Sequence, residues 1–256
     1  MELIDTHAHL YLSEFKGDID DVVKRAKDNE LREVYLPNID AETLDDMLGL
    51  VKAYPDFFKP MLGLHPTSVK ENYREVIDNL FSGADLSDFI AIGEIGIDLY
   101  WDKTYLSEQI EAFKAQIILA KQNDLPIVIH ARNSFSEIFE VIDKLNDPQL
   151  RGVFHCFTGS LEQARHIMNY KGFMMGIGGV VTFKNSGLDK VLADVPLEFM
   201  VLETDAPYLA PVPQRGKRNE SAYIRLVAER LASIKGKDIE EIARVTSQNA
   251  RKLFGK

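Results

Sequence analysis

The sequence predicts a single (β/α)₈ barrel, and three observations support that fold class. Eight short apolar runs recur along the 256 residues, separated by segments with helical periodicity. The runs are continuous rather than alternating, as parallel strands buried on both faces should be. No Pro-, Gly- or Ser-rich linker divides the chain, and barrels of this length commonly form one domain. We therefore expect one barrel domain over residues 1–256.

The predicted strands and helices alternate in chain order. The strands of the first half are 3–4, 34–36, 60–64 and 90–93, and those of the second half are 127–129, 152–154, 173–177 and 200–202. The clearest helix spans residues 105–121, where Ile110, Phe113 and Ile117 share one face. An open doubly wound sheet is the rival fold, but no glycine-rich phosphate loop follows the first strand. The alternation therefore favours the barrel.

Composition narrows the class of protein. The single cysteine excludes an internal disulfide framework and favours a reducing compartment. The chain has no basic-then-apolar leader and no apolar run near ~18 residues, so we expect a cytoplasmic protein without a membrane span. Nothing in the sequence requires more than a monomer. The formal net charge of −10 argues against a protein that coats DNA, although metals and a local basic patch can still hold phosphate.

The first predicted strand leads into two histidines, His7 and His9, separated by one residue. Side chains two apart in a strand point to the same face, so both imidazoles can reach one point. This is how a rigid element offers two nitrogen ligands to a transition metal. The alternative is a pair of surface histidines at a strand end.

Polar residues also follow most of the other predicted strands. The active site of a (β/α)₈ barrel lies at the carboxyl ends of its strands, so these side chains should meet on one rim. Five of the six histidines and acids at two further strands fall there; they are His7, His9, His65, Glu94, His130, His155 and Asp205. The sixth histidine, His166, falls within a predicted helix and is expected to lie on its face.

These residues predict a centre for two divalent ions that share the Glu94 carboxylate. Mixed nitrogen and oxygen ligands suit Zn²⁺ or Mn²⁺, whereas Mg²⁺ prefers oxygen and water. Asp205 can also accept a proton from water, so Glu94 and Asp205 are the candidate catalytic residues. We expect one ion at His7, His9, Glu94 and Asp205, and the other at Glu94, His130 and His155.

Three further polar residues near the predicted metal ligands are not expected to bind metal themselves. We expect Glu203 to support the site by hydrogen bonding, because it points to the opposite face from its neighbours in the strand. His65 either donates a hydrogen bond to a substrate phosphate or shapes the turn before Pro66. Cys156 is expected to be a small buried hydrophobe rather than a nucleophile.

A basic loop follows the eighth strand and carries Arg215, Lys217 and Arg218. If this loop lies beside the metal-binding residues, its cations can attract a substrate phosphate. The alternative is that they lie in a solvated loop with no role in binding. Tyr100 and Trp101 follow the fourth strand and either stack on a nucleobase or pack over the barrel edge.

Six motifs resemble those of the TatD family of metal-dependent deoxyribonucleases, in the family's order and across nearly the whole chain. They are Asp-Thr-His-Ala-His at 5–9, Gly-Leu-His-Pro at 63–66, Gly-Glu-Ile-Gly-Ile-Asp at 93–98, Pro-Ile-Val-Ile-His-Ala-Arg at 126–132, His-Cys-Phe-Thr-Gly at 155–159 and Leu-Glu-Thr-Asp-Ala-Pro at 202–207. The resemblance implies a metal-dependent hydrolase barrel with two metal ions. It also implies that DNA is the substrate, with single strands trimmed chiefly from the 3′ end.

The resemblance assigns His7, His9, Glu94, His130, His155 and Asp205 as metal ligands. It also implies that His65 and the basic loop approach the substrate. Two departures from the family pattern affect substrate contacts and loop shape rather than ligands. Asn133 and Ser134 stand where the family usually has acidic residues, and Ser221 stands where it usually has proline.

Two other classes of function compete with the nuclease. A hydrolase of a small amide, lactone or phosphoester would use the same barrel and ligands, and the acidic charge favours it. His130 stands where a carbamylated-lysine hydrolase would have its lysine, and the basic loop favours phosphate. A non-catalytic barrel would have no reason to keep six converging ligands. We therefore expect a metal-dependent exodeoxyribonuclease that uses a hydroxide activated by two metal ions.

Overall fold

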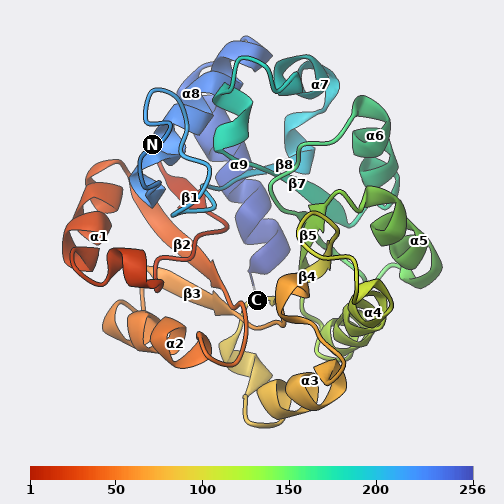
Figure 1. Ribbon diagram of the computed structural model, residues 1–256. Coiled ribbons are helices and arrows are strands. Elements are labelled where there is room, and N and C mark those ends of the chain that lie inside the picture. Colours follow the sequence, from red (N-terminus) through yellow and green to blue (C-terminus); the bar gives the residue numbers. More distant parts are fainter. Residues whose placement is uncertain (256) are drawn as a thin grey trace.

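The computed structural model describes residues 1–255, and it confirms the predicted barrel. The predicted domain end at residue 256 lies outside the described residues. Eight parallel strands form a central barrel surrounded by helices (Figure 1). The strands are β1 (Leu3–Asp5), β2 (Leu31–Pro37), β3 (Phe58–Met61), β4 (Ile92–Asp98), β5 (Ile127–Arg132), β6 (Gly152–Phe154), β7 (Phe173–Ile177) and β8 (Met200–Leu202).

The strands pair in parallel in chain order, as β1–β2–β3 and as β4 to β8. Two isolated parallel bridges, Leu62 with Ile92 and Ala8 with Ala206, join these two groups. The Gly93 amide donates to the Leu62 carbonyl at 2.9 Å across the first seam. Backbone hydrogen bonding therefore continues around the barrel, and the β1–β8 seam brings residues 7–9 beside residues 203–206.

Nine α-helices lie in the described part of the chain, and eight of them ring the strands (Figure 1). These eight are α1 (Ile19–Asp28), α2 (Leu44–Ala53), α3 (Tyr73–Ser82), α4 (Leu106–Gln122), α5 (Phe135–Leu145), α6 (Leu161–Asn169), α7 (Leu188–Asp194) and α8 (Ile224–Lys235). Helix α4 confirms the predicted helix at 105–121 to within one residue at each end. Among residues 1–255, no helix has the length and apolar character needed to span a bilayer.

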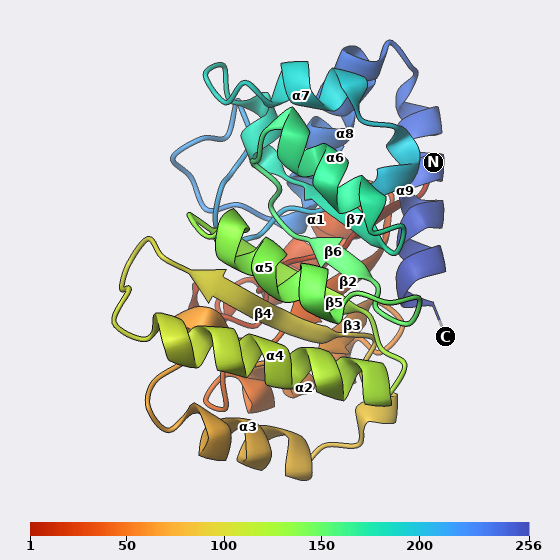
Figure 2. The same cartoon turned by 90° about the vertical axis from the view of Figure 1, so that its right-hand side faces the viewer.

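Helix α9 (Ile239–Phe254) lies across the end of the barrel opposite the strand arrowheads (Figure 2). Three of its side chains, Ala250, Leu253 and Phe254, are buried with residues from inside the barrel. The Phe254 ring meets the ring of Tyr35 edge-on at 5.1 Å between centroids. The amino end of the barrel is thus closed by apolar packing, and the carboxyl end is left for the polar residues.

Five of the predicted strands have different bounds in the structure. Strand β1 continues to Asp5, β2 spans Leu31–Pro37 rather than 34–36, and β5 continues to Arg132, so that His130 lies within it rather than after it. Strand β3 ends at Met61 rather than at 64, and β4 runs from Ile92 to Asp98 rather than from 90 to 93. All seven residues of β4 are buried, including Glu94 and Asp98. The prediction ended β4 too early because it followed apolar residues only. Strand β4 continues through Glu94 and Asp98, whose buried carboxylates are paired with His130 inside the barrel. Glu94 therefore lies within a strand and not beyond its end.

Candidate metal centre

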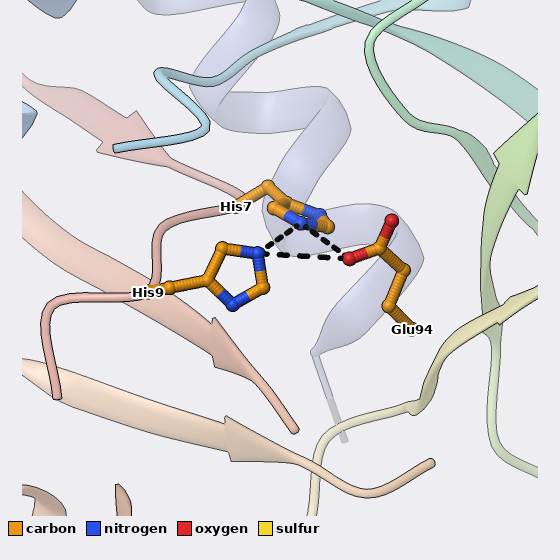
Figure 3. A group of neighbouring side chains, drawn as sticks. All are labelled: His7, His9 and Glu94. Carbon is orange, nitrogen blue, oxygen red and sulfur yellow. Dashed lines mark hydrogen bonds and ion pairs between the residues drawn. The ribbon is translucent and has the colours of Figure 1, made fainter. Parts of the chain in front are cut away.

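Glu94 lies at the centre of the polar cluster, with one carboxylate oxygen turned toward the histidines that follow β1 (Figure 3). Its Oε2 lies 3.1 Å from His7 Nε2 and 3.6 Å from His9 Nε2. The two Nε2 atoms are 3.3 Å apart, which confirms that the imidazoles reach one point. The intervening Ala8 bridges Ala206 and holds this segment extended against the end of β8.

The other oxygen of Glu94 faces a second set of imidazoles. Its Oε1 lies 2.7 Å from His130 Nδ1, 2.9 Å from His155 Nε2 and 3.5 Å from His65 Nε2. The Glu94 side chain is almost fully buried, so neither oxygen is screened by bulk water. One carboxylate therefore separates two groups of nitrogen atoms, as a ligand shared by two ions would.

Acidic residues from the end of β8 approach the same cluster. Asp205 Oδ1 lies 3.8 Å from His7 Nε2 and 3.7 Å from His9 Nε2. Glu203 takes the supporting position expected of it: its Oε1 accepts a 2.5 Å hydrogen bond from the Cys156 amide. That oxygen also lies 3.3 Å from His155 Nδ1.

In His9 and His130, contacts on the outer side of the ring determine which nitrogen carries the proton. Tyr11 donates its hydroxyl proton to the Pro37 carbonyl, so at 2.9 Å it accepts from His9 Nδ1. Asp98 Oδ2 lies 2.8 Å from His130 Nε2 and accepts its proton. When these rings are neutral, the inward nitrogen is thus left with a lone pair, the state in which imidazole binds a metal. Burial opposes the charge on His130, but hydrogen bonds to Asp98 and Glu94 raise its pKa, so a metal ion at Nδ1 competes with a proton.

His65 has the opposite arrangement. It precedes the 3₁₀ helix η2 (Pro66–Ser68), and its Nδ1 accepts a 3.1 Å hydrogen bond from the Thr67 amide. The proton of a neutral His65 is then on Nε2, the nitrogen that faces Glu94 and lies 3.3 Å from His130 Nδ1. His65 therefore shapes the turn and directs an N–H group into the site, and its donation to a substrate phosphate stays a prediction.

The donor set fits divalent metal ions. Three groups bring ligand atoms within 4.8 Å of one another: His7, His9 and Glu94; His7, His155 and Glu203; His65, Glu94 and His130. His7 Nδ1 and Glu203 Oε2 are buried without a hydrogen-bond partner in the described chain. Buried polar atoms without partners are uncommon, so the cluster is incomplete with protein atoms alone.

Burial and mutual charge shift the pKa values of the imidazoles in different directions. Burial lowers the pKa of His7 to about 4, and it lowers that of His9 well below its usual value. Burial also opposes the charge on His155, but the carboxylates of Glu94 and Glu203 raise its pKa well above the usual value. A proton on His155 supplies positive charge in the metal-free site, and metal binding must displace it.

The two catalytic candidates among the acids also differ. Burial opposes the ionisation of Glu94, yet His155, His65 and His7 hold its pKa well below the usual value. Burial raises the pKa of Asp205 to about 7. Glu94 is therefore held as a carboxylate, whereas Asp205 binds a proton more tightly than an ordinary aspartate.

The cluster opens into a cavity of about 800 Å³ at the carboxyl end of the barrel. Such a volume holds a ligand the size of a nucleotide. Besides ligand candidates, one arginine and several exposed aromatic and apolar side chains line it. The lining includes His9, His65, Glu94, Asp98, Trp101, His130, Arg132, His155, Cys156, Asp205, Tyr208 and Leu209.

The three cations of the basic loop do not line this cavity. Arg218 donates to both carboxylate oxygens of Asp18, at 2.8 and 2.7 Å. Lys217 donates to Gln214 at 3.0 Å, and the Arg215 guanidinium lies 4.2 Å from the centre of the Phe183 ring. Their contact with substrate stays a prediction, and this placement does not favour it.

Sequence reasoning gave no role to Arg132, which lines the cavity. Its position two residues after His130 on β5 was the available signal. Cys156 is half-buried beside the cluster, and burial raises the pKa of its thiol, as expected of a residue that is not a nucleophile. His166 lies on α6 as predicted, with Nε2 2.9 Å from Asp143 and away from the cavity.

Comparison with known proteins gives a family for this barrel. The family model "TatD related DNase" matches residues 4–255. The chain belongs to this family. It is 37% identical over 253 residues to the "Uncharacterized metal-dependent hydrolase YabD" of Bacillus subtilis, with 98% of each chain covered.

Other TatD-family members resemble the chain over nearly its whole length. It is 30% identical over 259 residues to the "3'-5' ssDNA/RNA exonuclease TatD" of Pantoea ananatis, with 99% of each chain covered. Its structure superposes on YJJV, a TatD homologue from Escherichia coli, with a TM-score of 0.90 at 29% identity, covering 99% of this chain and 98% of the other. The chain is therefore a metal-dependent hydrolase of the TatD type, with a histidine and carboxylate cluster suited to metal ions.

Proposed function

We propose that this chain is a 3′→5′ exodeoxyribonuclease that hydrolyses single-stranded DNA with two divalent metal ions. One observation carries the proposal: the two oxygens of Glu94 face two separate groups of imidazole nitrogens, at 2.7–3.6 Å. A carboxylate between two ligand groups is the arrangement that hydrolases of phosphodiesters use for paired metals. The TatD exonuclease of Pantoea ananatis supports the choice of substrate by its name.

The residues divide between two ions as follows. One ion would be held by Oε2 of Glu94 with His7 and His9, and by Asp205 beside those two imidazoles. The other would be held by Oε1 of Glu94 with His130 and His155. Bound ions there supply positive charge to the phosphate oxygens and lower the pKa of water, which is why such sites hydrolyse phosphodiesters near neutral pH. The mixed nitrogen and oxygen ligands favour Mn²⁺ or Zn²⁺ over Mg²⁺.

The side chains of the protein have distinct tasks in this reaction. Asp205 accepts the proton of the attacking water, because its carboxylate lies 3.7–3.8 Å from His9 and His7 Nε2 and lines the cavity. The Nε2–H group of His65 donates to a phosphate oxygen of the substrate. Arg132 provides the fixed positive charge nearest the cluster among the residues that line the cavity. All of these groups come from one chain, so we propose that a monomer is active.

Digestion of end-labelled single-stranded DNA tests the proposal. Oligonucleotides labelled at the 3′ or the 5′ end are incubated with Mg²⁺, Mn²⁺ or Zn²⁺, and parallel reactions contain EDTA. We expect the 3′ label to be released first, as mononucleotides, while the 5′-labelled strand shortens stepwise. EDTA should abolish both changes.

The Asp205→Asn variant tests the role of Asp205 in the reaction. Asparagine keeps the shape of Asp205 but cannot take a proton, so cleavage should fall by about a hundred-fold or more. Metal-loaded protein that leaves every DNA substrate intact would overturn the nuclease and favour a hydrolase of small molecules. Internal cuts without loss of the 3′ label would contradict the exonuclease and leave a nuclease of another type.

A further inference from the structure

Two aromatic side chains lie exposed just beyond the end of β4. Trp101 is 72% exposed and Tyr100 is 53% exposed, and their rings meet at right angles with centroids 4.8 Å apart. Neither ring packs over the barrel edge, which was the alternative open from the sequence. Trp101 lines the cavity that contains the metal cluster. A large exposed ring beside a reaction site indicates a surface for a ligand with a flat apolar face.

Arg132 stacks on both rings and gives this surface a positive charge. Its guanidinium carbon lies 3.8 Å from the centre of the Tyr100 ring and 5.4 Å from that of Trp101. No carboxylate among residues 1–255 pairs with it, in contrast to Arg25 and Arg218, which are held by acids on the outer surface. On a chain with a net charge of −10, an arginine without an acidic partner is available to an anionic ligand.

The aromatic surface is fixed relative to the metal cluster by a single carboxylate. Asp98 Oδ1 accepts a 2.9 Å hydrogen bond from the Tyr100 amide, and its Oδ2 accepts from His130 Nε2 at 2.8 Å. Strand pairing adds a second link, because Asp98 is in register with Arg132 and the Leu99 amide donates to the Arg132 carbonyl at 2.9 Å. The backbone that carries Tyr100 and Arg132 is thereby held at a set position from His130.

The surface formed by Tyr100, Trp101 and Arg132 lies on the side of the metal cluster that faces Oε1 of Glu94. His130, beside Trp101 and Arg132, faces Oε1 of Glu94. On the other side, Tyr208 also lines the cavity, with its ring 6.3 Å from that of His9, which faces Oε2. A chain-like ligand crossing the cluster would therefore meet the cation and the tryptophan at one end of the cavity.

We propose that Trp101, Tyr100 and Arg132 form a nucleobase platform for the substrate strand. The base of a nucleotide next to the cleaved phosphate stacks on Trp101, and the Arg132 guanidinium contacts the neighbouring phosphate. A base can lie flat on a protein ring only when it is unpaired and unstacked from a duplex, so the platform selects single strands and frayed ends. This inference rests on the proposed nuclease function and names how that site recognises its substrate.

Fluorescence tests the platform without any cleavage. Trp101 is the only tryptophan in the chain, so the intrinsic tryptophan signal reports on this position alone. The protein in EDTA is titrated with oligothymidylate and with an oligomer of the same length and charge that lacks all bases. We expect oligothymidylate to quench the emission and shift its maximum, and the abasic strand to leave both unchanged. Equal responses to both strands, or no response to either, would overturn the platform.

Kinetics with matched variants test the same inference during turnover. Trp101→Ala should lower kcat/KM on single-stranded DNA by about ten-fold, and Trp101→Phe should retain much of the activity. Neither change should affect removal of abasic residues from a 3′ end. Arg132→Ala should raise KM on both substrates, whereas Arg74→Ala, which removes a guanidinium stacked on Tyr73 far from the cavity, should change neither.

The two proposals fail in different ways. If the wild-type protein cleaves DNA and Trp101→Ala acts equally on base-bearing and abasic ends, the platform is wrong and the nuclease stands. If the wild-type protein does not cleave DNA, the nuclease is wrong. The platform fails with it unless the base-dependent quenching persists, in which case the cavity is a site for nucleobases with another reaction.

Discussion

The two ends of this barrel are built from the same eight strands but bury opposite kinds of side chain. At the amino end, α9 packs Leu253 and Phe254 against residues such as Val128 and Val201. At the carboxyl end, the strands and the segments after them bury His7, His9, His155 and the carboxylates of Glu94, Asp98 and Glu203, and they leave His65 and His130 half-buried. One end therefore resembles an ordinary core, and the other resembles a charge cluster.

The difference separates stability from function. Burial of apolar surface stabilises a fold without further partners. Burial of ionisable groups is unfavourable unless they are paired or bind a metal. The amino end should therefore determine whether the chain folds, and the carboxyl end whether the folded chain reacts. Variants at each end test that division.

The largest effect is expected from Glu94→Gln at the carboxyl end. The substitution keeps the shape of Glu94 but removes the charge that both groups of imidazoles face. Nuclease activity should fall on the order of a thousand-fold, because charged groups at a reacting centre commonly contribute that much to rate. Metal analysis of the dialysed protein should show fewer bound ions than in wild type. A variant with full activity would contradict the central role of Glu94.

Phe254→Ala at the amino end should lower stability and leave activity nearly unchanged, the reverse of what is expected for Glu94→Gln. It removes the buried ring at the end of α9 that packs against Tyr35. Such truncations lower the free energy of unfolding by about 3 kcal/mol when the surroundings can partly collapse. The melting temperature of a chain this size should fall by roughly 6–12 °C. At 25 °C, kcat should stay within about two-fold of wild type. A large loss of kcat in protein that is still folded would mean that the two ends are coupled.

Asp98→Asn tests whether a contact outside the ligand set at the carboxyl end affects metal binding without affecting stability. It weakens the contact that leaves the Nδ1 lone pair of His130 facing Glu94. Loss of such an outer contact typically lowers metal affinity by about 10–100-fold. Isothermal titration with Mn²⁺ measures this directly, and thermal melting of the metal-free protein should change little. Unaltered affinity would show that His130 is oriented by packing alone.

The smallest effect is expected at the outer surface, where Asp18 pairs with Arg218 and Arg25. Hydrogen bonding to Arg218 lowers the pKa of Asp18, so its ionised form stabilises the folded chain. That stabilisation is complete above the ordinary pKa of about 3.9 and disappears as the pH falls through the lowered value. Because the pair is partly exposed, Asp18→Asn should cost less than about 1 kcal/mol at pH 7.

Melting curves of wild type and Asp18→Asn between pH 2.5 and 7 check this sign. The difference between the two proteins should be constant above about pH 5 and shrink as the solution becomes more acidic. A difference that grows toward low pH would mean that Asp18 is not held ionised by its arginines.

Much of the fold was predictable because apolar runs and helical periodicity record burial directly. Strands β6, β7 and β8 begin and end where the sequence placed them. Strand β4 did not, because its burial continues through Glu94 and Asp98, and hydropathy cannot show that two carboxylates have partners inside a barrel.

The inner site was also predictable, and its outer contacts were not. His7 and His9 are two apart in an extended segment, and that spacing fixes their common direction. Whether His65 offers a lone pair or an N–H group depends on the Thr67 amide, whose direction follows from the turn and not from residue type. Charge density drew attention to Lys217 and Arg218, yet folding placed them at another pocket and left the isolated Arg132 at the cavity.

The seam between β1 and β8 also affects the order in which the protein can mature on the ribosome. Ala8 pairs with Ala206, so roughly 200 residues must be added before the two partners coexist. At about 5–20 residues per second, that interval is on the order of 10–40 s. A nascent chain that stops before Met200 lacks both the closing strand and Asp205, which lies beside His7 and His9 in the cluster. Incomplete translation therefore yields fragments in which the histidine and carboxylate cluster is not assembled.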